Sequence, residues 1–381
     1  MRRRIGMDVT AAVMQGGGIG RYTRELAQAL AQVGHEFELR FFTARPPAVL
    51  PVPNPLPTAP NIHLRRAPLD ERWLYRLWYR LRLPLPVQTW TGRLDLFHSP
   101  DFVLPPVSGR IPTLVTVHDL SFVHYPETFT PALVRYLNDA VPRSVRRATH
   151  VLADSQATQA DLVNLWQIDP GKITVLYSGV NPSFRPVTER EQMAALRARH
   201  YLDDGPYILS VSTIQPRKNY PMLMRAFRPL AGQLPHHLVI AGGKGWLYEE
   251  VLAEVGRLGL DGRVHFLGFV ADDDLPALYS GAALFAFPSL YEGFGLPLLE
   301  AMACGAPVVT SNASSLPEVA GEAAVKLSPT DTAAWTEAMY TLLTHPMERA
   351  RLVAAGFRQA RRFTWETAAR QLVEVYERLL R

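Results

Sequence analysis

The stretch YEGFGLPLLE, residues 291–300, decides how the second half of this chain folds. The apolar run 283–287 just before it has the composition of a buried strand. Gly293 and Gly295 permit a tight backbone turn, and Pro297 suits the first turn of a helix. The stretch therefore predicts a strand, a glycine turn and a helix whose free amide groups face a ligand.

Two carboxylates flank this predicted helix start. Glu292 precedes the glycine turn, and Glu300 lies within the helix that follows. An ionised carboxylate accepts several hydrogen bonds, which suits hydroxyl groups, and a helix N-terminus suits phosphate. Hydroxyls beside a phosphate indicate a sugar nucleotide. The alternative is that both glutamates are solvated charges, which the helix dipole also favours near its N-terminus.

Length and composition predict a globular protein with two domains. A chain of 381 residues exceeds the size at which one core usually keeps growing, and its 48% hydrophobic and 20% charged residues are ordinary values. The single cysteine, Cys304, fits a reducing compartment. No apolar stretch is long enough for a membrane span, and residues 1–9 lack a signal-peptide pattern. We therefore expect a cytoplasmic protein.

Short β-branched or aromatic runs alternate with helical stretches in both halves, which predicts an α/β fold with parallel sheets. A turn cluster at 178–186 separates the halves, and 365–380 has helical apolar spacing. The proline-rich stretch 46–60 predicts a surface loop. The predicted strands are 4–7, 37–42, 94–98, 113–117, 150–153 and 173–176, then 207–211, 237–241, 264–267, 283–287, 307–310 and 323–326. The predicted helices of the first half are 19–33, 131–147 and 156–166.

A glycine-rich loop at 16–20 precedes the first long helix. Its glycine spacing does not match the dinucleotide-binding pattern G-x-G-x-x-G, and the loop that begins at Asp8 is too long for that motif. Gly17 and Gly18 are instead candidates for a flexible contact with an anion or a sugar. An ordinary surface turn is the alternative.

Polar residues follow two further predicted strands. His118 and Asp119 end the apolar strand 113–117, and the carboxyl ends of parallel strands face the ligand crevice. A histidine there is otherwise a hydrogen-bonded core residue. Arg217 and Lys218 follow the first strand of the second half, where fixed cations stabilise a departing diphosphate. A solvated turn is the alternative.

The acidic run 272–274 resembles a metal-binding motif, but the helical spacing after it predicts that these aspartates cap a helix. No other cluster has metal-ligand spacing. We expect no metal or other cofactor, because Arg217, Lys218 and two helix N-termini neutralise the diphosphate. Lys244 lies at another strand end and is a further candidate for a nucleotide contact.

The net charge of +5 is unevenly distributed. Arginines interleave with tryptophans and tyrosines between residues 65 and 93, which predicts a basic amphipathic segment for an anionic membrane surface. An ordinary surface helix whose arginine stems cover apolar groups is the alternative, and no nucleic-acid-binding module accompanies the charge. The arginines are Arg65, Arg66, Arg72, Arg76, Arg80, Arg82 and Arg93.

The order of these motifs resembles the retaining glycosyltransferases of family 4. The stretch 292–309 is similar to their main signature, and the resemblance also covers 17–22, 117–119, 154–155, 216–219 and 315–319. It implies the GT-B fold, in which two Rossmann-like domains with parallel sheets face each other across a cleft. Residues 1–180 with a crossing helix at 364–381 then form the acceptor-side domain, and 181–363 bind the nucleotide sugar.

The resemblance also implies roles for single residues. His118 approaches the donor sugar, Glu292 holds its hydroxyls, and Glu300 holds the ribose. Arg217 supplies the guanidinium, because this chain has Ser212-Thr213 where the commonest family pattern has Gly-Arg. The catalytic candidates are His118, Glu292, Arg217 and Lys218. The substrate-binding candidates are Gly17, Gly18, Asp119, Gly293, Phe294, Gly295, Leu296 and Glu300, with Phe269 and Val270 beside the nucleobase.

The motifs look most like those of bacterial mannosyltransferases that use GDP-mannose to build surface polysaccharide. We therefore expect retaining transfer of a hexose, mannose, to a glycan or lipid-linked acceptor, at the inner face of the membrane. A UDP-sugar-dependent enzyme such as a glucosyltransferase is the near alternative. A sugar-nucleotide epimerase of the same fold and a non-catalytic scaffold are more distant ones. The donor base, the transferred sugar, the acceptor, the linkage and the oligomeric state stay open.

Overall fold

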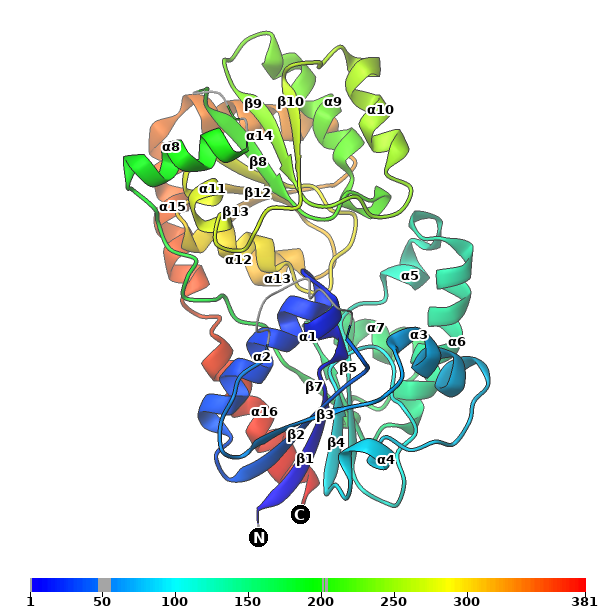
Figure 1. Cartoon of the computed structure of the whole chain (residues 1–381). Coiled ribbons are helices and arrows are strands. Elements are labelled where there is room, and N and C mark those ends of the chain that lie inside the picture. Colours follow the sequence, from blue (N-terminus) through cyan, green and yellow to red (C-terminus); the bar gives the residue numbers. More distant parts are fainter. Residues whose placement is uncertain (1, 47–55, 201, 203–204) are drawn as a thin grey trace. The chain divides into compact units, whose positions relative to one another are not determined.

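The computed structural model describes residues 2–46, 56–200, 202 and 205–381. They form two compact units, each built on one parallel sheet (Figure 1). The first unit comprises the described residues of Met1–Leu120, Arg135–Gly179 and Thr364–Arg381, and the second comprises those of Ser121–Val134 and Val180–Phe363. Most of the proline-rich stretch 46–60, expected to be a surface loop, lies outside the described residues.

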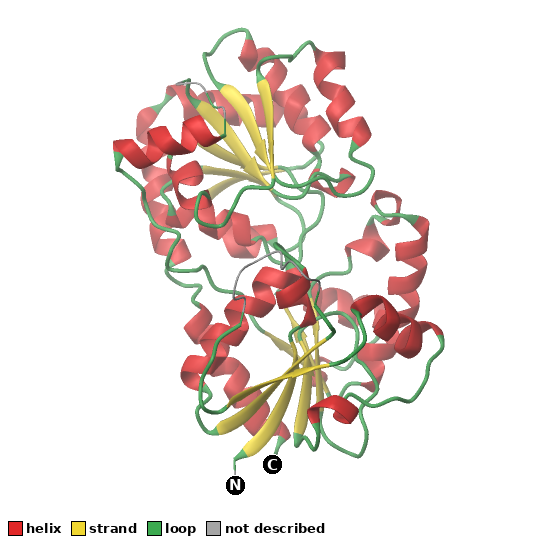
Figure 2. Ribbon diagram, in the orientation of Figure 1, coloured by secondary structure: helices red, strands yellow, loops and turns green. Residues whose placement is uncertain are grey.

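The first unit holds a sheet in the order β3-β2-β1-β4-β5-β6-β7, and all its strand pairs are parallel. Strands β4, β5 and β6 are buried along their whole length, as expected where helices cover a parallel sheet (Figure 2). The strand order reverses between β1 and β4, which places the usual ligand crevice at their carboxyl ends. The strands are β1 (Arg3–Asp8), β2 (Phe37–Thr43), β3 (Ile62–Arg66), β4 (Leu96–Ser99), β5 (Thr113–Val117), β6 (His150–Ala153) and β7 (Ile173–Val175).

Two elements of the first unit differ from the prediction. Arg65 and Arg66 were assigned to a basic surface segment, but they belong to β3, an edge strand whose exposed position tolerates charged side chains. The expected loop that begins at Asp8 contains the short helix α1 (Thr10–Met14). The other helices are α2 (Ile19–Val33), α3 (Glu71–Tyr75), the π-helical turn η1 (Arg76–Arg80), α4 (Gln88–Thr91), α6 (Pro131–Arg147), α7 (Gln156–Trp166), η3 (Pro170–Lys172) and α16 (Trp365–Leu379). The first turn of α6, up to Val134, is assigned to the second unit.

The last helix, α16, packs beside α2 (Figure 1). Its buried face includes Trp365, Leu372 and Tyr376. The hydroxyl of Tyr376 lies 2.8 Å from Nδ1 of His98 on β4, so the helix is joined to the sheet by a buried hydrogen bond as well as by apolar packing. The C-terminal residues are thus an integral part of the first unit.

The second unit holds a parallel sheet in the order β10-β9-β8-β11-β12-β13. Its strand order reverses between β8 and β11. The strands are β8 (Tyr207–Val211), β9 (His237–Ala241), β10 (Val264–Gly268), β11 (Leu284–Phe287), β12 (Val308–Ser311) and β13 (Ala324–Leu327). The helices are α5 (Ser121–His124), η2 (Pro126–Thr128), α8 (Arg190–Arg199), η4 (Pro216–Lys218), α9 (Tyr220–Ala231), α10 (Glu249–Leu258), α11 (Leu275–Ser280), α12 (Leu296–Ala303), α13 (Leu316–Ala320), α14 (Thr332–Thr344) and α15 (Pro346–Ala360).

The segment 121–134 belongs to the second unit, although it was expected in the first domain. The His124 ring stacks on Tyr291 with centroids 5.0 Å apart, and the Trp246 indole donates a 2.6 Å hydrogen bond to the carbonyl of Thr128. These contacts join residues more than a hundred positions apart, which no local sequence pattern reveals.

The acidic run 272–274 precedes a helix, as predicted, with Asp274 at the N-cap position of α11. Asp274 is the residue before α11, and its side chain makes no capping hydrogen bond. Its carboxylate instead pairs with Arg199 and lies 3.1 Å from Nε2 of His200. In the described part of the chain, no helix has the length and apolar character needed to cross a bilayer.

Candidate active site

In the second unit, three charged side chains meet where the strand order reverses. Arg217 and Lys218 lie on η4, in the connection after β8, and Glu292 follows the neighbouring strand β11. The Lys218 ammonium donates a 2.5 Å hydrogen bond to Oε1 of Glu292, and Nη1 of Arg217 lies 3.2 Å from Oε2. Each of the three residues is less than a tenth exposed. We call them the cation cluster.

The charges of the cation cluster determine the ionisation of its carboxyl group. Burial raises the pKa of Glu292, but the Lys218 ammonium and the Arg217 guanidinium outweigh this effect and lower that pKa to about 2. Glu292 is therefore an anion at neutral pH. Two cations face this one carboxylate, so the cluster keeps an excess of positive charge that suits an anionic ligand.

The turn after Glu292 is held by two serines. The backbone amide of Glu292 donates to the hydroxyl of Ser314 at 2.7 Å, and the hydroxyl of Ser315 donates to the carbonyls of Glu292 and Phe294 at 2.9 and 3.0 Å. Gly295 has a φ of 105°, and a Cβ there would lie 2.8 Å from the Leu316 side chain. The turn therefore requires glycine, and it leads into α12 at Leu296.

The two serines were not assigned a role from the sequence. The stretch 315–319 entered only as part of the family resemblance. Their partners lie more than twenty residues earlier in the chain, so only the fold brings them together.

Glu300 lies on α12 and is almost fully buried. Its Oε2 accepts a 2.8 Å hydrogen bond from the hydroxyl of Tyr279 on α11. Phe294, a predicted substrate contact, is also buried, with its ring edge-on to Phe363 at a centroid distance of 5.7 Å. Any contact of Phe294 with a ligand must therefore come from its backbone.

The remaining candidates of the second unit lie at other strand ends. After β10, Phe269 is exposed and Val270 is buried, so the two side chains point into different surroundings. Gly293 is buried within the turn. Lys244 is exposed, and its ammonium lies 5.0 Å from the ring centroid of Tyr248.

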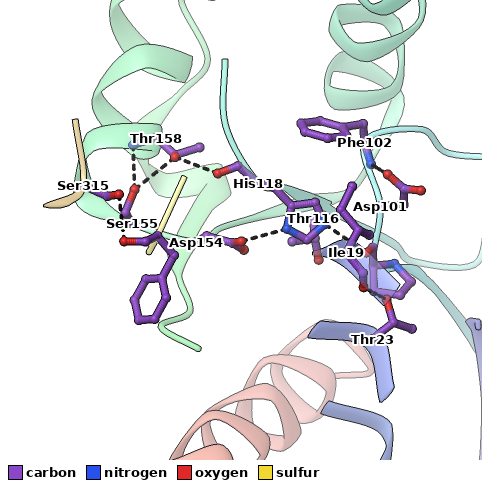
Figure 3. Close-up of polar contacts among 12 residues, drawn as sticks. Ile19, Thr23, Asp101, Phe102, Thr116, His118, Asp154, Ser155, Thr158 and Ser315 are labelled. Carbon is purple, nitrogen blue, oxygen red and sulfur yellow. Dashed lines mark hydrogen bonds and ion pairs between the residues drawn. The ribbon is translucent and has the colours of Figure 1, made fainter. Parts of the chain in front are cut away.

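In the first unit, His118 follows β5 and is paired with Asp154, which follows the adjacent strand β6 (Figure 3). Nδ1 of the imidazole lies 2.7 Å from Oδ2 of Asp154, and Nε2 lies 3.2 Å from the carbonyl of Pro100. Burial lowers the pKa of His118, but Asp154, followed by Asp101 and the carbonyl of Pro100, more than compensates and raises it to about 9. His118 is therefore a buried cation at neutral pH.

The glycine loop of the first unit is held by hydrogen bonds from an arginine side chain to backbone carbonyls. Gly17 and Gly18 are exposed, and a Cβ on either would meet no atom within 4 Å. The buried guanidinium of Arg24 donates to the carbonyls of Ala12, Gln15 and Gly16 at 3.1, 2.5 and 2.8 Å. The loop is thus anchored at one end and open at the glycines. No sequence signal marked Arg24.

The structure gathers the sequence candidates into two groups, one in each unit. Arg217, Lys218 and Glu292 form the cation cluster, and His118 lies at the corresponding edge of the other sheet, with Asp119 half-buried next to it. Within the described ranges, no three His, Cys, Asp or Glu side chains come together as metal ligands.

Two units, each with a parallel α/β sheet and buried charged residues after the carboxyl ends of its strands, are the architecture expected of the GT-B fold. Family comparisons give the same class. The family described as Glycosyltransferase Family 4 matches residues 16–184, and that described as Glycosyl transferases group 1 matches residues 193–359. This chain belongs to the family 4 glycosyltransferases.

Similar proteins span nearly the whole chain. O-antigen chain mannosyltransferase B of Escherichia coli is 33% identical over 95% of this chain and 96% of its own. MMP alpha-(1->4)-mannosyltransferase of Mycolicibacterium hassiacum is 30% identical over 96% and 95%. The crystal structure of Anabaena Alr3699/HepE in complex with UDP and glucose superimposes with a TM-score of 0.74 at 19% identity, and it covers 99% of this chain and 100% of its own. The last comparison speaks for the fold alone.

Proposed function

We propose that this enzyme transfers a mannosyl group from GDP-mannose to a glycan or lipid-linked acceptor in polysaccharide biosynthesis, with retention of anomeric configuration. The family supports glycosyl transfer, and two relatives named as mannosyltransferases support the sugar. The observation that carries the proposal is the cation cluster, since its excess positive charge lies beside the start of α12.

The proposed reaction breaks the bond between the anomeric carbon and the diphosphate oxygen. A bond forms on the same face to the acceptor oxygen, and the acceptor proton passes to the departing phosphate. Negative charge accumulates on the leaving diphosphate, so Lys218 and Arg217 stabilise the transition state more than the bound donor. Because two fixed cations supply this charge, we propose that transfer needs no metal ion.

The carboxylate of Glu292 has a second part in this proposal. Without a ligand it pairs with both cations of the cluster. When a diphosphate takes over part of this pairing, the carboxylate becomes available to accept hydrogen bonds from the sugar hydroxyls. We further propose that Glu300 and the backbone of 293–296 contact the nucleotide. Gly17 and Gly18 then pack against the donor diphosphate and sugar near the acceptor, and Asp119 orients the loop or faces the acceptor.

The test is a pair of measurements on the unmodified protein. Thermal shift against GDP, UDP and their sugars reports which nucleotide binds, because a true ligand raises the melting temperature by mass action. Mannose transfer from GDP-mannose, measured with and without EDTA, reports the reaction and its metal dependence. Stabilisation by UDP alone, with glucose transfer from UDP-glucose, would overturn the donor assignment. Release of free nucleotide with an altered sugar and no acceptor would indicate an epimerase.

We also propose that the segment 65–93 contacts an anionic membrane surface on the cytoplasmic side. Trp73 is 49% exposed and Leu81 is 61% exposed, and both lie among exposed arginines. The guanidinium of Arg76 lies 5.0 Å from the centre of the Trp73 indole ring, so apolar and cationic groups share one face. An apolar side chain beside a cation suits the interface of an acidic bilayer.

Co-sedimentation with vesicles of anionic phospholipid tests this contact. We expect binding that weakens with salt and is lost in the double variant Arg72→Glu/Arg76→Glu. The matched control is Arg361→Glu/Arg362→Glu, which changes two exposed arginines just after α15. Equal loss in both double variants, or binding to neutral vesicles as well, would contradict a specific contact by this segment.

A further inference from the structure

The imidazole ring of His118 is held by hydrogen bonds at both nitrogens and by two aromatic rings that pack against it. Tyr22 from α2 lies edge-on at a centroid distance of 4.9 Å, and Phe102 lies edge-on at 5.3 Å. Nδ1 is bound by Asp154 and Nε2 by the carbonyl of Pro100. The ring is therefore fixed in position and orientation before any ligand arrives.

The backbone of His118 is fixed as well, from the helix that follows Asp154. The Thr158 hydroxyl donates a 3.0 Å hydrogen bond to the carbonyl of His118 (Figure 3). Ser155 is the N-cap of α7 and accepts from the amide of Thr158 at 3.1 Å, which holds this first helical turn in place. Residues of the stretch 154–158 thus bind His118 twice, since Asp154 pairs with its ring and Thr158 donates to its main-chain carbonyl.

The two hydrogen bonds of the imidazole differ in strength. The contact to Asp154 is 2.7 Å long and joins opposite charges, whereas the contact to the Pro100 carbonyl is 3.2 Å, at the long end of the usual range. Oδ1 of Asp154 is buried and finds no hydrogen-bond donor within the described residues, so the interaction with His118 is the main stabilisation of this carboxylate. Nε2 has the weaker bond and is the nitrogen able to change its partner.

We propose that Asp154 is the positioning residue of His118: its carboxylate holds the Nδ1 proton, and it thereby directs Nε2–H to donate to an oxygen of the transferred sugar. This inference rests on the proposed function and adds a residue to its machinery. In this arrangement a donor-sugar oxygen replaces the Pro100 carbonyl at Nε2. A charged donor gives a stronger hydrogen bond than a neutral one, so keeping the ring protonated favours sugar binding.

The charged and titratable groups around His118 support a protonated ring. They are Tyr22 from α2, His98 on β4, Asp101 after β4 and Asp154 after β6, together with Asp119, whose charge acts on the Asp154 carboxylate. Burial and the charge of His118 lower the pKa of His98 to about 3, so His98 is neutral and does not repel the imidazolium. Burial raises the pKa of Tyr22 well above its ordinary value, so this phenol is neutral too. The carboxylates of Asp154 and Asp101 favour the cation.

The variant Asp154→Asn separates charge from shape, because the amide oxygen can still accept from Nδ1. The first readout is the NMR titration of His118 in the full-length protein, identified by the resonance missing from His118→Gln. We expect a pKa near 9 in the unmodified protein and a fall of about two units or more in Asp154→Asn. Titration near 6.5 in the unmodified protein, or an unchanged value in the variant, would overturn the proposal.

The second readout is the pH dependence of kcat/KM for the donor. The alkaline limb of Asp154→Asn should move toward neutral pH by about two units, the shift expected of the histidine itself, with activity at about pH 6 closer to that of the unmodified enzyme. A purely structural role would lower the activity equally at every pH, and that result would contradict the proposal. The matched control is Asp95→Asn, which breaks a carboxylate pair with Arg4 elsewhere in the first unit and should leave the limb in place.

These measurements are separable from the proposed function. Failure of the unmodified protein to transfer mannose or glucose would refute the reaction. The titration of His118 requires no turnover, so it tests the effect of Asp154 on the ring in either case.

Discussion

The two units bury their charges in opposite ways. In the cation cluster, Arg217 and Lys218 both contact one carboxylate, so positive charge is in excess. Both side chains stay protonated near neutral pH. Around His118, Asp154 and Asp101 face one imidazole, so the positive charge depends on a single proton. The second unit therefore keeps its positive charge across the neutral and mildly alkaline range, whereas the first unit loses the proton of His118 at alkaline pH.

The largest expected effect tests the constant charge of the cation cluster. The variant Lys218→Met should lower kcat by about 10²–10³, the usual cost of losing one fixed group that stabilises developing negative charge. Glu292 keeps Arg217 as its partner, so the fold should survive. Initial transfer rates and circular dichroism check both points. The control Lys326→Met removes a lysine on β13, away from the cluster, and should retain activity. Equal loss in both variants would show that Lys218 has no special role.

The second effect concerns the proton on His118. Its folded-state pKa of about 9 lies above the ordinary 6.5, so its pairing stabilises the protein fully below about pH 6.5 and this contribution disappears as pH rises through 9. A shift of this size corresponds to about 3 kcal/mol. The free energy of unfolding, from urea titrations at several pH values, should fall more steeply between these limits in the unmodified protein than in His118→Gln. Parallel curves would contradict a raised pKa.

The third effect concerns the charge balance of the cation cluster. The variant Glu292→Gln keeps the shape but removes the anion, so Lys218 and Arg217 repel each other without compensation. We expect the ligand-free protein to lose about 2 kcal/mol of stability and to bind a nucleoside diphosphate more tightly, because the added phosphate replaces the lost carboxylate. Transfer should nevertheless decrease. Thermal shift with and without GDP measures both effects, and weaker GDP binding would contradict this account.

Glu292 also affects how the free energy of unfolding depends on pH in acid. The pKa of Glu292 is depressed from 4.5 to about 2, so its contribution is present above about pH 4.5 and is lost as pH falls through 2. Glu292→Gln should therefore differ from the unmodified protein at neutral pH and approach it in acid. A stability difference that persists unchanged at about pH 2 would show that the pair contributes through packing and not through charge.

The smallest effect concerns Glu300. The variant Tyr279→Phe removes the hydroxyl that donates to Oε2 of Glu300, at a cost of about 1 kcal/mol for a single buried hydrogen bond. If Glu300 contacts the nucleotide, KM for the donor should change several-fold with little change in kcat. Steady-state kinetics and thermal unfolding separate the two. Loss of stability with unaltered KM would leave Glu300 with a structural role only.

Much of the architecture could be predicted from the sequence, because buried parallel strands are short apolar runs bounded by turn residues. The strands β5 and β6 and the helix that begins at Ile19 follow such patterns. The pattern fails at β3, where an edge position allows arginines that resemble a surface segment. It also fails for 121–134, because membership of a unit depends on contacts with residues distant in the sequence.

The candidate site could be predicted as a set of residues but not as a set of pairs. Lys218 and Glu292 were both named, yet their contact spans 74 positions and exists only because β8 and β11 are adjacent. Asp154 was noted within a motif without a role, and its contact with His118 depends on the pairing of β5 with β6. Local patterns identify the chemistry, whereas strand order determines which groups meet.

The membership of 121–134 in the second unit has a practical consequence for building hybrid enzymes. An exchange of halves with a relative, cut only near residue 180, would leave His124 facing a foreign residue in place of its stacking partner Tyr291, one position before Glu292. The helical turns that follow His118 should therefore be exchanged together with the rest of the second unit, which requires two additional crossover points, near residues 120 and 135.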